Sequence, residues 1–117
     1  GSGTLAVIGS VAGDRARKSN YNYGSAKSLI ESYVFGLYHR FYNSGINISL
    51  IKPGPTLSSM TKNIKGSANF ADIEKVAGTI VKGIESKKKI IYAPKRWAYI
   101  MLIIKLLPNF IFNRLDI

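Results

Sequence analysis

The sequence predicts an α/β fold in which about three strands form a parallel sheet with flanking helices. Short apolar runs of strand length alternate with longer segments whose apolar residues recur at helical spacing. One helical segment lies between each pair of consecutive strands, and connections of this length are typical of right-handed crossovers between parallel strands. The 117 residues, of which 46% are hydrophobic, are enough for one domain with a modest core.

Three stretches are predicted to be strands. Residues 4–8 (TLAVI) form a continuous apolar run that ends at Gly9, which favours a strand covered on both faces. Residues 46–51 (INISLI) alternate in polarity and end before Pro53, and residues 90–93 form the third strand. Because open α/β sheets bind ligands at the carboxyl ends of their strands, the residues that follow the first strand are candidates for a site.

Two amphipathic segments are predicted to be helices. The first runs from about Tyr21 or Asn22 to Asn43, and the second runs from Asp72 to Ser86. The apolar surface of the first helix is wider than one stripe, so we expect it to be covered on more than one side. Its helical repeat contains Ala26, Leu29, Ile30, Tyr33, Val34, Leu37 and Phe41, whereas Phe35, Tyr38 and Tyr42 fall outside. The polar residues 56–70 are predicted to form a loop that covers a ligand.

The chain is expected to divide into an α/β unit, residues 1–94, and an apolar helical tail with basic flanks, residues 95–117. The apolar run of the tail is about a dozen residues long and is interrupted by Lys105, so it is too short for a spanning helix of about 20 residues. Trp97 and Tyr99 at one end, with the basic flanks, favour a helix that lies in the membrane interface. The alternative is a helix packed on the core or on a second subunit.

The charge and the composition limit the classes of function. Seventeen basic and six acidic residues give a formal charge of +11, which would suit nucleic acid or an anionic membrane leaflet. The lysines are scattered and the aromatic residues mostly follow helical core spacing, so we expect no nucleic-acid partner. The absence of cysteine excludes disulfides and thiolate sites, and the single histidine, His39, disfavours a histidine metal site or triad.

The stretch Tyr23-Gly24-Ser25-Ala26-Lys27 carries the most specific chemistry. A tyrosine and a lysine four residues apart lie one turn apart on the same face of a helix. The ammonium favours the phenolate over the phenol, and such a group can give a proton to a carbonyl oxygen or take one from an alcohol. Ser10, thirteen residues before Tyr23, could hold the same oxygen from the end of the first strand. Alone, a Y-x-x-x-K pattern is common by chance on solvated helices.

Four features in order resemble the C-terminal half of the short-chain dehydrogenase/reductase family. They are a strand ending in I-G-S-V-A-G, the Y-G-S-A-K stretch at the start of a long helix, a second strand, and the turn K-P-G-P-T-L-S-S-M-T. The resemblance extends from Thr4 to about Ala93. It implies the C-terminal half of a Rossmann-like, doubly wound parallel sheet and an oxidoreductase that uses NAD or NADP.

The resemblance also implies a role for each site residue. Tyr23 would be the catalytic acid/base, Lys27 would promote its ionisation and bind the nicotinamide ribose, and Ser10 would orient the substrate oxygen. Further cofactor contacts are implied for Pro53, Gly54, Thr56 and Ser58. No residue is assigned to a metal. Leu57 and Gly9 depart from the usual family residues, which affects only details of the cofactor loop.

The stretch from Ser10 to Lys27 and the tail W-A-Y-I-M-L-I-I-K-L-L-P are similar to one subgroup of the family. Its members are keto-reductases that act with a flavin oxidase partner to epimerise decaprenylphosphoryl-ribose. This similarity implies a secondary alcohol or ketone substrate, such as a sugar linked to a polyprenyl phosphate. It also implies a cytoplasmic location, at the inner face of the membrane.

The T-G-x-x-x-G-x-G turn, which receives the cofactor pyrophosphate in the family, does not occur in this sequence. We therefore expect that this chain alone neither binds a dinucleotide tightly nor turns over substrate. We expect it to form an oligomer or to pair with a complementary chain. The alternative to an enzyme is a non-enzymatic remnant or split half that acts by docking to such a chain.

Overall fold

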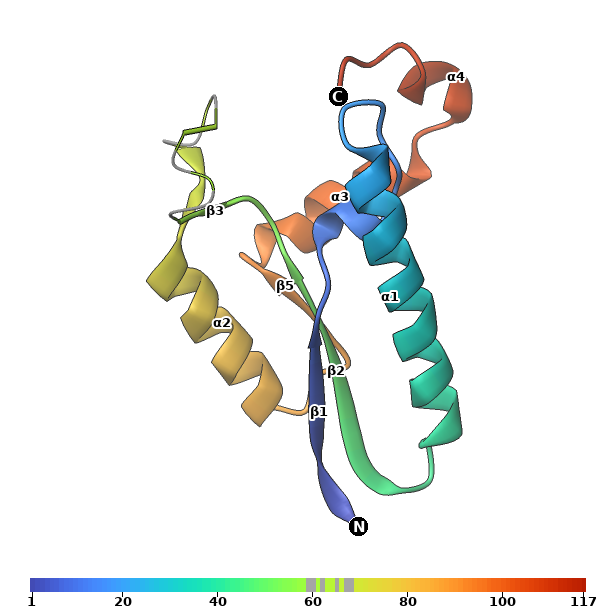
Figure 1. Ribbon diagram of the computed structural model, residues 1–117, viewed down its shortest axis with the longest axis vertical. Coiled ribbons are helices and arrows are strands. Elements are labelled where there is room, and N and C mark those ends of the chain that lie inside the picture. Colours follow the sequence, from blue (N-terminus) through green and yellow to red (C-terminus); the bar gives the residue numbers. More distant parts are fainter. Residues whose placement is uncertain (59–60, 62, 65, 67–68) are drawn as a thin grey trace.

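Three parallel strands form the centre of the structure, a computed structural model that describes residues 1–58, 61, 63–64, 66 and 69–117 (Figure 1). The strands are β1 (Ser2–Ile8), β2 (Gly45–Pro53) and β5 (Ile90–Ala93), in the order β1-β2-β5. Both pairs are parallel. Helices α1 (Tyr21–Arg40) and α2 (Ile73–Glu85) lie on opposite sides of this sheet (Figure 1). The predicted α/β fold with a parallel sheet and flanking helices is confirmed.

The middle strand β2 carries the core. Its residues from Ile48 to Lys52 are all buried, as expected for a parallel strand that is covered on both faces. In contrast, β1 is an edge strand within the described residues, and every residue except Val7 is exposed. The expectation that residues 4–8 are covered on both faces is therefore wrong within this chain.

Helix α1 packs on β2 through one face only. Val34 is 1% exposed and contacts Ile48 and Leu50, and partly buried side chains surround this cluster. Tyr38, which the helical repeat left outside, packs against this core and donates a hydrogen bond to the Lys89 carbonyl. The helix also ends at Arg40 rather than Asn43, because Phe41 leaves the helical conformation and begins a turn. Four residues of the predicted repeat, Ile30, Val34, Leu37 and Phe41, therefore pack on the core, whereas Leu29 and Tyr33 are exposed.

Helix α2 begins where its sequence predicts. The Asp72 side chain caps the helix by accepting a hydrogen bond from the Lys75 amide at 3.3 Å. Gly83 lets the helix approach β5 closely, since a Cβ there would lie 2.7 Å from the Ile91 side chain. Before this helix, the predicted loop 56–70 is bounded by the short parallel pair β3 (Thr56–Leu57) and β4 (Ala71–Asp72). Residues 59–60, 62, 65 and 67–68 of that loop lie outside the described residues.

The tail forms two helices, α3 (Arg96–Leu106) and α4 (Asn109–Phe112). Arg15, which lies two residues after the short 3-10 helix η1 (Val11–Gly13), contacts both of them. The Arg15 guanidinium donates to the carbonyls of Ile104 and Leu107, at 2.7 Å each, and to the Asn109 side chain at 2.9 Å. It also lies 3.7 Å from the centre of the Phe112 ring. The tail is thus fastened to the loop after β1, and the division between residues 94 and 95 stays a prediction.

One side of the tail stays exposed although Met101 is buried. The exposed side chains are Tyr99, Leu102, Ile103, Leu106 and Phe110. Within the described part of the chain, no helix has both the length and the apolar character needed to cross a membrane.

Candidate functional site

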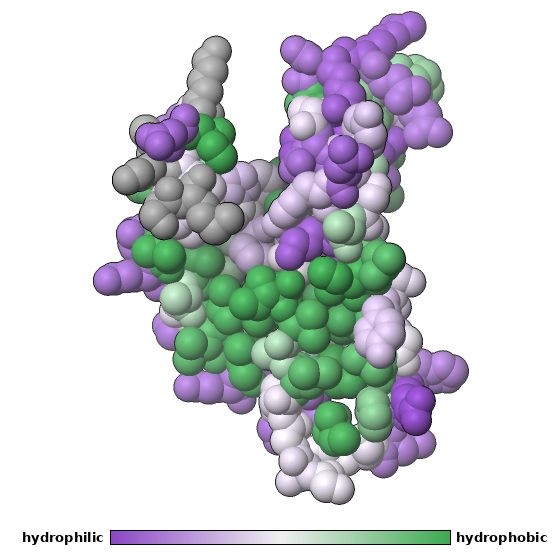
Figure 2. All heavy atoms as spheres, in the orientation of Figure 1, coloured by the Kyte–Doolittle hydropathy of each residue, from purple (hydrophilic) through white to green (hydrophobic). Residues whose placement is uncertain are grey.

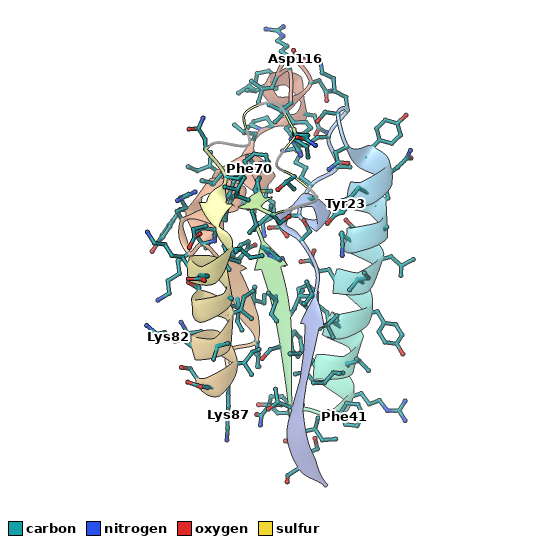
Figure 3. All side chains as sticks on the ribbon, turned by 60° about the vertical axis from the view of Figure 1, so that its left-hand side comes forward. Tyr23, Phe41, Phe70, Lys82, Lys87 and Asp116 are labelled. Atoms are coloured by element: carbon teal, nitrogen blue, oxygen red, sulfur yellow. The ribbon has the colours of Figure 1, made fainter. Side chains whose placement is uncertain are left out.

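A cavity of about 480 Å³ opens where the carboxyl ends of β1 and β2 meet the first turn of α1. Six of the seven predicted site residues line it: Ser10, Tyr23, Pro53, Gly54, Thr56 and Ser58. Tyr23 and Phe70, which also lines the cavity, lie toward the same end of the molecule (Figure 3). Residues 43 positions apart, such as Ser10 and Pro53, therefore meet at one site, as expected for the carboxyl edge of a parallel sheet.

Lys27 is the predicted residue that does not line this cavity. Its ammonium lies 5.5 Å from the centre of the Tyr23 ring, on the same side of α1. The lysine ammonium and the tyrosine ring therefore lie beside each other at the start of α1.

Close packing between η1 and α1 brings Ser10 and Tyr23 to the cavity. Ser10 caps η1, and its Oγ accepts a hydrogen bond from the Ala12 amide at 3.1 Å, which leaves the hydroxyl proton free to donate elsewhere. Gly24 permits the approach, because a Cβ there would lie 2.8 Å from the Ala12 carbonyl oxygen. The Ser28 hydroxyl donates to the Gly13 carbonyl at 2.6 Å and holds the two segments together.

The turn after β2 forms the opposite wall. The Gly54 amide donates to the Ala93 carbonyl at 2.9 Å, and the Thr56 hydroxyl donates to the Gly54 carbonyl at 2.9 Å. The Trp97 indole of the tail lies against this turn, and a Cβ on Gly54 would be only 2.2 Å from its Nε1 atom. Any residue other than glycine would displace the tail or the turn.

Beneath the cavity lies a buried ionic cluster. The Lys52 ammonium is 2.6 Å from Asp14 Oδ1 and 2.6 Å from Glu31 Oε1, and the Tyr92 hydroxyl donates to Asp14 Oδ2 at 2.5 Å. The side chains of Lys52 and Asp14 are 2% and 0% exposed. Charges so far from water are tolerated only when they are paired and hydrogen-bonded, as they are here.

This cluster connects the segments that carry the candidate site. Asp14 directly follows η1, Lys52 directly precedes Pro53, and Glu31 lies one turn after Lys27 on α1. The sequence analysis did not identify these residues. A signal was available, since opposite charges at the carboxyl ends of neighbouring parallel strands are expected to lie close together.

The environment fixes the protonation of two members of the cluster. Burial lowers the pKa of Lys52, but the hydrogen bonds and charges of Asp14 and Glu31 outweigh it and hold that pKa above its ordinary value. Burial and the hydrogen bond to Asp14 raise the pKa of Tyr92 to about 12, against the opposing charge of Lys52. At neutral pH Lys52 is therefore charged and Tyr92 is neutral.

The lining of the cavity combines polar and apolar residues. Ser10, Tyr23 and Ser58 line it together with Val11 and Phe70. This mixture fits the nicotinamide end of a dinucleotide, which combines a flat ring with an amide and a ribose. Among the described residues, no group of three or more His, Cys, Asp or Glu side chains could hold a metal ion.

The fold agrees with the comparisons. The family model for short chain dehydrogenases matches residues 1–69, and the chain belongs to this family. It is 30% identical to an uncharacterized oxidoreductase from Mycobacterium tuberculosis over 115 residues, which are 98% of this chain and 46% of that protein. An uncharacterized oxidoreductase from Streptomyces coelicolor is 31% identical over 116 residues, with 98% and 45% covered.

Solved structures show the same fold. A short chain dehydrogenase from Burkholderia cenocepacia, in complex with NADP, matches with a TM-score of 0.82 at 14% identity, over 99% of this chain and 48% of that one. A short-chain dehydrogenase from Sphingobium yanoikuyae, in complex with NADPH, matches with a TM-score of 0.68 at 16% identity, over 91% and 46%. The chain thus spans about half the length of the proteins that it matches.

Replacing the buried lysine tests the cluster. In Lys52→Met, the Asp14 carboxylate stays buried without its cationic partner, so we expect the free energy of unfolding to fall by about 3 kcal/mol or more. The matched control is Lys18→Met, which removes a lysine that pairs with Asp116 at the surface and should change stability by less than about 1 kcal/mol. Urea unfolding followed by circular dichroism measures both values, and equal losses would contradict the assignment.

Alkaline pH should weaken the cluster. The folded-state pKa of Tyr92, about 12, lies above the ordinary value of 10.0, so its contribution is fully present below pH 10 and is lost as the pH rises toward 12. The raised pKa of Lys52 acts in the same direction as the pH rises above its ordinary value of 10.5. We expect urea unfolding to show a smaller loss of stability between pH 10 and 12 in Tyr92→Phe than in the wild type. Parallel profiles would contradict this.

Proposed function

We propose that the chain carries the proton-handling part of an NAD- or NADP-dependent oxidoreductase site. The reaction would be hydride transfer between nicotinamide and the carbon of a secondary alcohol or ketone. The observation that carries the proposal is that Ser10, Tyr23 and the Pro53-Gly54 turn line one cavity, with the Lys27 ammonium beside the tyrosine ring. Family membership supports oxidoreduction in general.

Each residue has a role at a defined atom. The bound nicotinamide would supply or accept the hydride. Tyr23 Oη gives its proton to the substrate oxygen when a ketone is reduced, and takes one back when an alcohol is oxidised. The Lys27 ammonium lies beside the Tyr23 ring, and the Ser10 hydroxyl would donate to the same oxygen and orient it. Pro53, Gly54, Thr56 and Ser58 would hold the nicotinamide end, and Lys27 would bind the ribose.

The cavity also favours an anionic substrate group. Arg17 lines it, together with Asn20, and a guanidinium binds phosphate or carboxylate well. This supports a phosphate-bearing substrate, and we propose the polyprenyl-phosphate-linked sugar that the subgroup resemblance implies.

We also propose that this chain corresponds to the C-terminal half of the catalytic domain and needs a complementary half to work. It spans about half of its relatives and has no T-G-x-x-x-G-x-G turn, so the pyrophosphate would be bound elsewhere. Alone it should neither bind a dinucleotide tightly nor turn over substrate.

A second candidate function is docking without catalysis. Within the described residues β1 pairs on one side only, and such an open edge is a template for another strand. Figure 2 shows a broad hydrophobic band that runs from α2 across the sheet to α1. Exposed members on β1 and α2 include Leu5, Ile8, Ile73 and Val81. This surface supports a complementary chain as partner, whether or not the pair is an enzyme.

Peripheral membrane contact is proposed for the tail. Its exposed apolar side chains lie near Arg96 and Lys105 on a chain with a formal charge of +11. Apolar and basic residues together suit the anionic inner face of a cytoplasmic membrane.

Tyr23→Phe tests the proposed chemistry. With the complementary half supplied, we expect NADPH oxidation to fall by at least about 100-fold, because the phenolic proton is lost while the ring remains. Tyr33→Phe is the control, since this exposed tyrosine lies on the same helix and outside the cavity. Retained turnover in Tyr23→Phe would contradict the assignment.

Saturable binding of NADPH by the chain alone, measured by calorimetry, would contradict the need for a complementary half.

Cosedimentation with vesicles tests the membrane contact. We expect vesicles that contain anionic lipid to bind the chain, and the double variant Ile103→Ser/Leu106→Ser to lose most of the bound fraction. The control variant Leu29→Ser/Tyr33→Ser removes equally exposed side chains from α1 and should bind like the wild type. Equal binding by all three forms would contradict a role for the tail.

A further inference from the structure

A second cavity, of about 710 Å³, lies between α2, β5 and the start of α3. It shares no lining residue with the candidate catalytic cavity. Four lysines from three separate segments line it: Lys75, Lys82, Lys88 and Lys95. The hydroxyl groups of Thr79 and Ser86 add neutral hydrogen-bonding groups to the same walls.

No carboxylate pairs directly with the lysines of this cavity in the described residues. No aspartate or glutamate lines it, and among the described residues no carboxylate lies within 4.0 Å of any of the four ammonium groups. Lys18, Lys52 and Lys105 each lie within that distance of a carboxylate. Like charges around one cavity repel each other, and a bound anion would relieve that repulsion.

The lysines project from fixed backbone. Lys75 and Lys82 lie on one face of α2, two turns apart, and the Thr79 hydroxyl between them donates to the Lys75 carbonyl at 3.1 Å. The Lys88 amide donates to the Gly83 carbonyl at 3.1 Å, and its carbonyl accepts from the buried Ser49 hydroxyl at 2.7 Å. The backbone positions of Lys75, Lys82 and Lys88 are therefore set by the fold, whereas the side chains of all four lysines are exposed.

The wall of α2 leaves room for a ligand at Gly78. A Cβ at this lining position would meet nothing within 4 Å, so the missing side chain leaves open space beside Lys75 and Lys82. Glycine inside an exposed helix turn costs about 1 kcal/mol relative to alanine, and the close packing that explains Gly83 is absent at Gly78.

We propose that this cavity binds a ligand with two or more phosphate groups. Lysine binds phosphate as a compact point charge, and four such charges with the Ser86 hydroxyl match the charge and the acceptors of a diphosphate. The phosphates could belong to a free metabolite or to a lipid headgroup. A lipid is suited because Lys95 and Ala98, which line the cavity, are followed along α3 by the exposed apolar residues Leu102 and Leu106. The proposal does not depend on the catalytic residues, so it stands or falls separately from the proposed oxidoreductase function.

Calorimetric titration of the chain with inorganic diphosphate, at physiological salt, tests the site. We expect saturable one-to-one binding, and Lys82→Glu/Lys95→Glu should weaken it by about 100-fold, or about tenfold per lysine. The matched control is Lys87→Glu/Lys89→Glu, which changes the net charge equally but replaces lysines that do not line this cavity. Figure 3 shows Lys82 on α2 and Lys87 at the end of that helix. The control should change affinity by less than about threefold, in line with screened surface charges.

Gly78→Glu is a second variant, because it places a carboxylate in the cavity while replacing glycine by a better helix former. It should abolish binding while the circular dichroism spectrum stays unchanged. If diphosphate does not bind but vesicles with anionic lipid do, and the lysine and Gly78 variants remove that binding, the source is a lipid headgroup. Absence of both kinds of binding, or equal weakening by the matched control, would overturn the proposal.

Discussion

The buried pair between Lys52 and Asp14 is the interaction on which the arrangement of this chain depends. Both side chains are almost without contact to water, so either charge alone would cost several kcal/mol. The pair forms only when the end of β2 meets the loop that follows β1. Tyr92 from β5 and Glu31 from α1 complete the hydrogen bonding, so four segments must converge at this point.

The candidate site is a consequence of that convergence. The residues close to the pair in sequence, Ser10 to Ala12 before Asp14 and Pro53-Gly54 after Lys52, form facing walls of the cavity. Arg15, the neighbour of Asp14, fastens the tail through two carbonyls and Asn109. One loop therefore determines both the entrance to the cavity and the position of the tail. The lysine-lined cavity lies outside this network and is formed by α2 and β5.

Local signals in the sequence predicted the elements well. Residues 90–93 form β5 as expected, and α2 starts and ends within one residue of its predicted bounds, because its apolar stripe and its Asp72 cap are local. The cavity that gathers six of the predicted site residues followed from the resemblance, not from periodicity. The place of Tyr38 in the core, the anchoring of the tail by Arg15 and the Lys52 cluster were missed. The last two depend on contacts across 21 or more residues, which no local pattern encodes. Tyr38 was missed because the apolar surface of α1 is wider than one stripe.

A double-mutant cycle on Asp14 and Lys52 tests this account most directly. The free energies of unfolding of the wild type, Asp14→Asn, Lys52→Met and the double variant give the coupling between the two side chains. We predict a coupling of about 2 kcal/mol or more, with the double variant more stable than the sum of the single losses implies, because the second substitution removes an already unpaired group. Effects that add within about 0.5 kcal/mol would show that the pair does not hold the ends of β1 and β2 together.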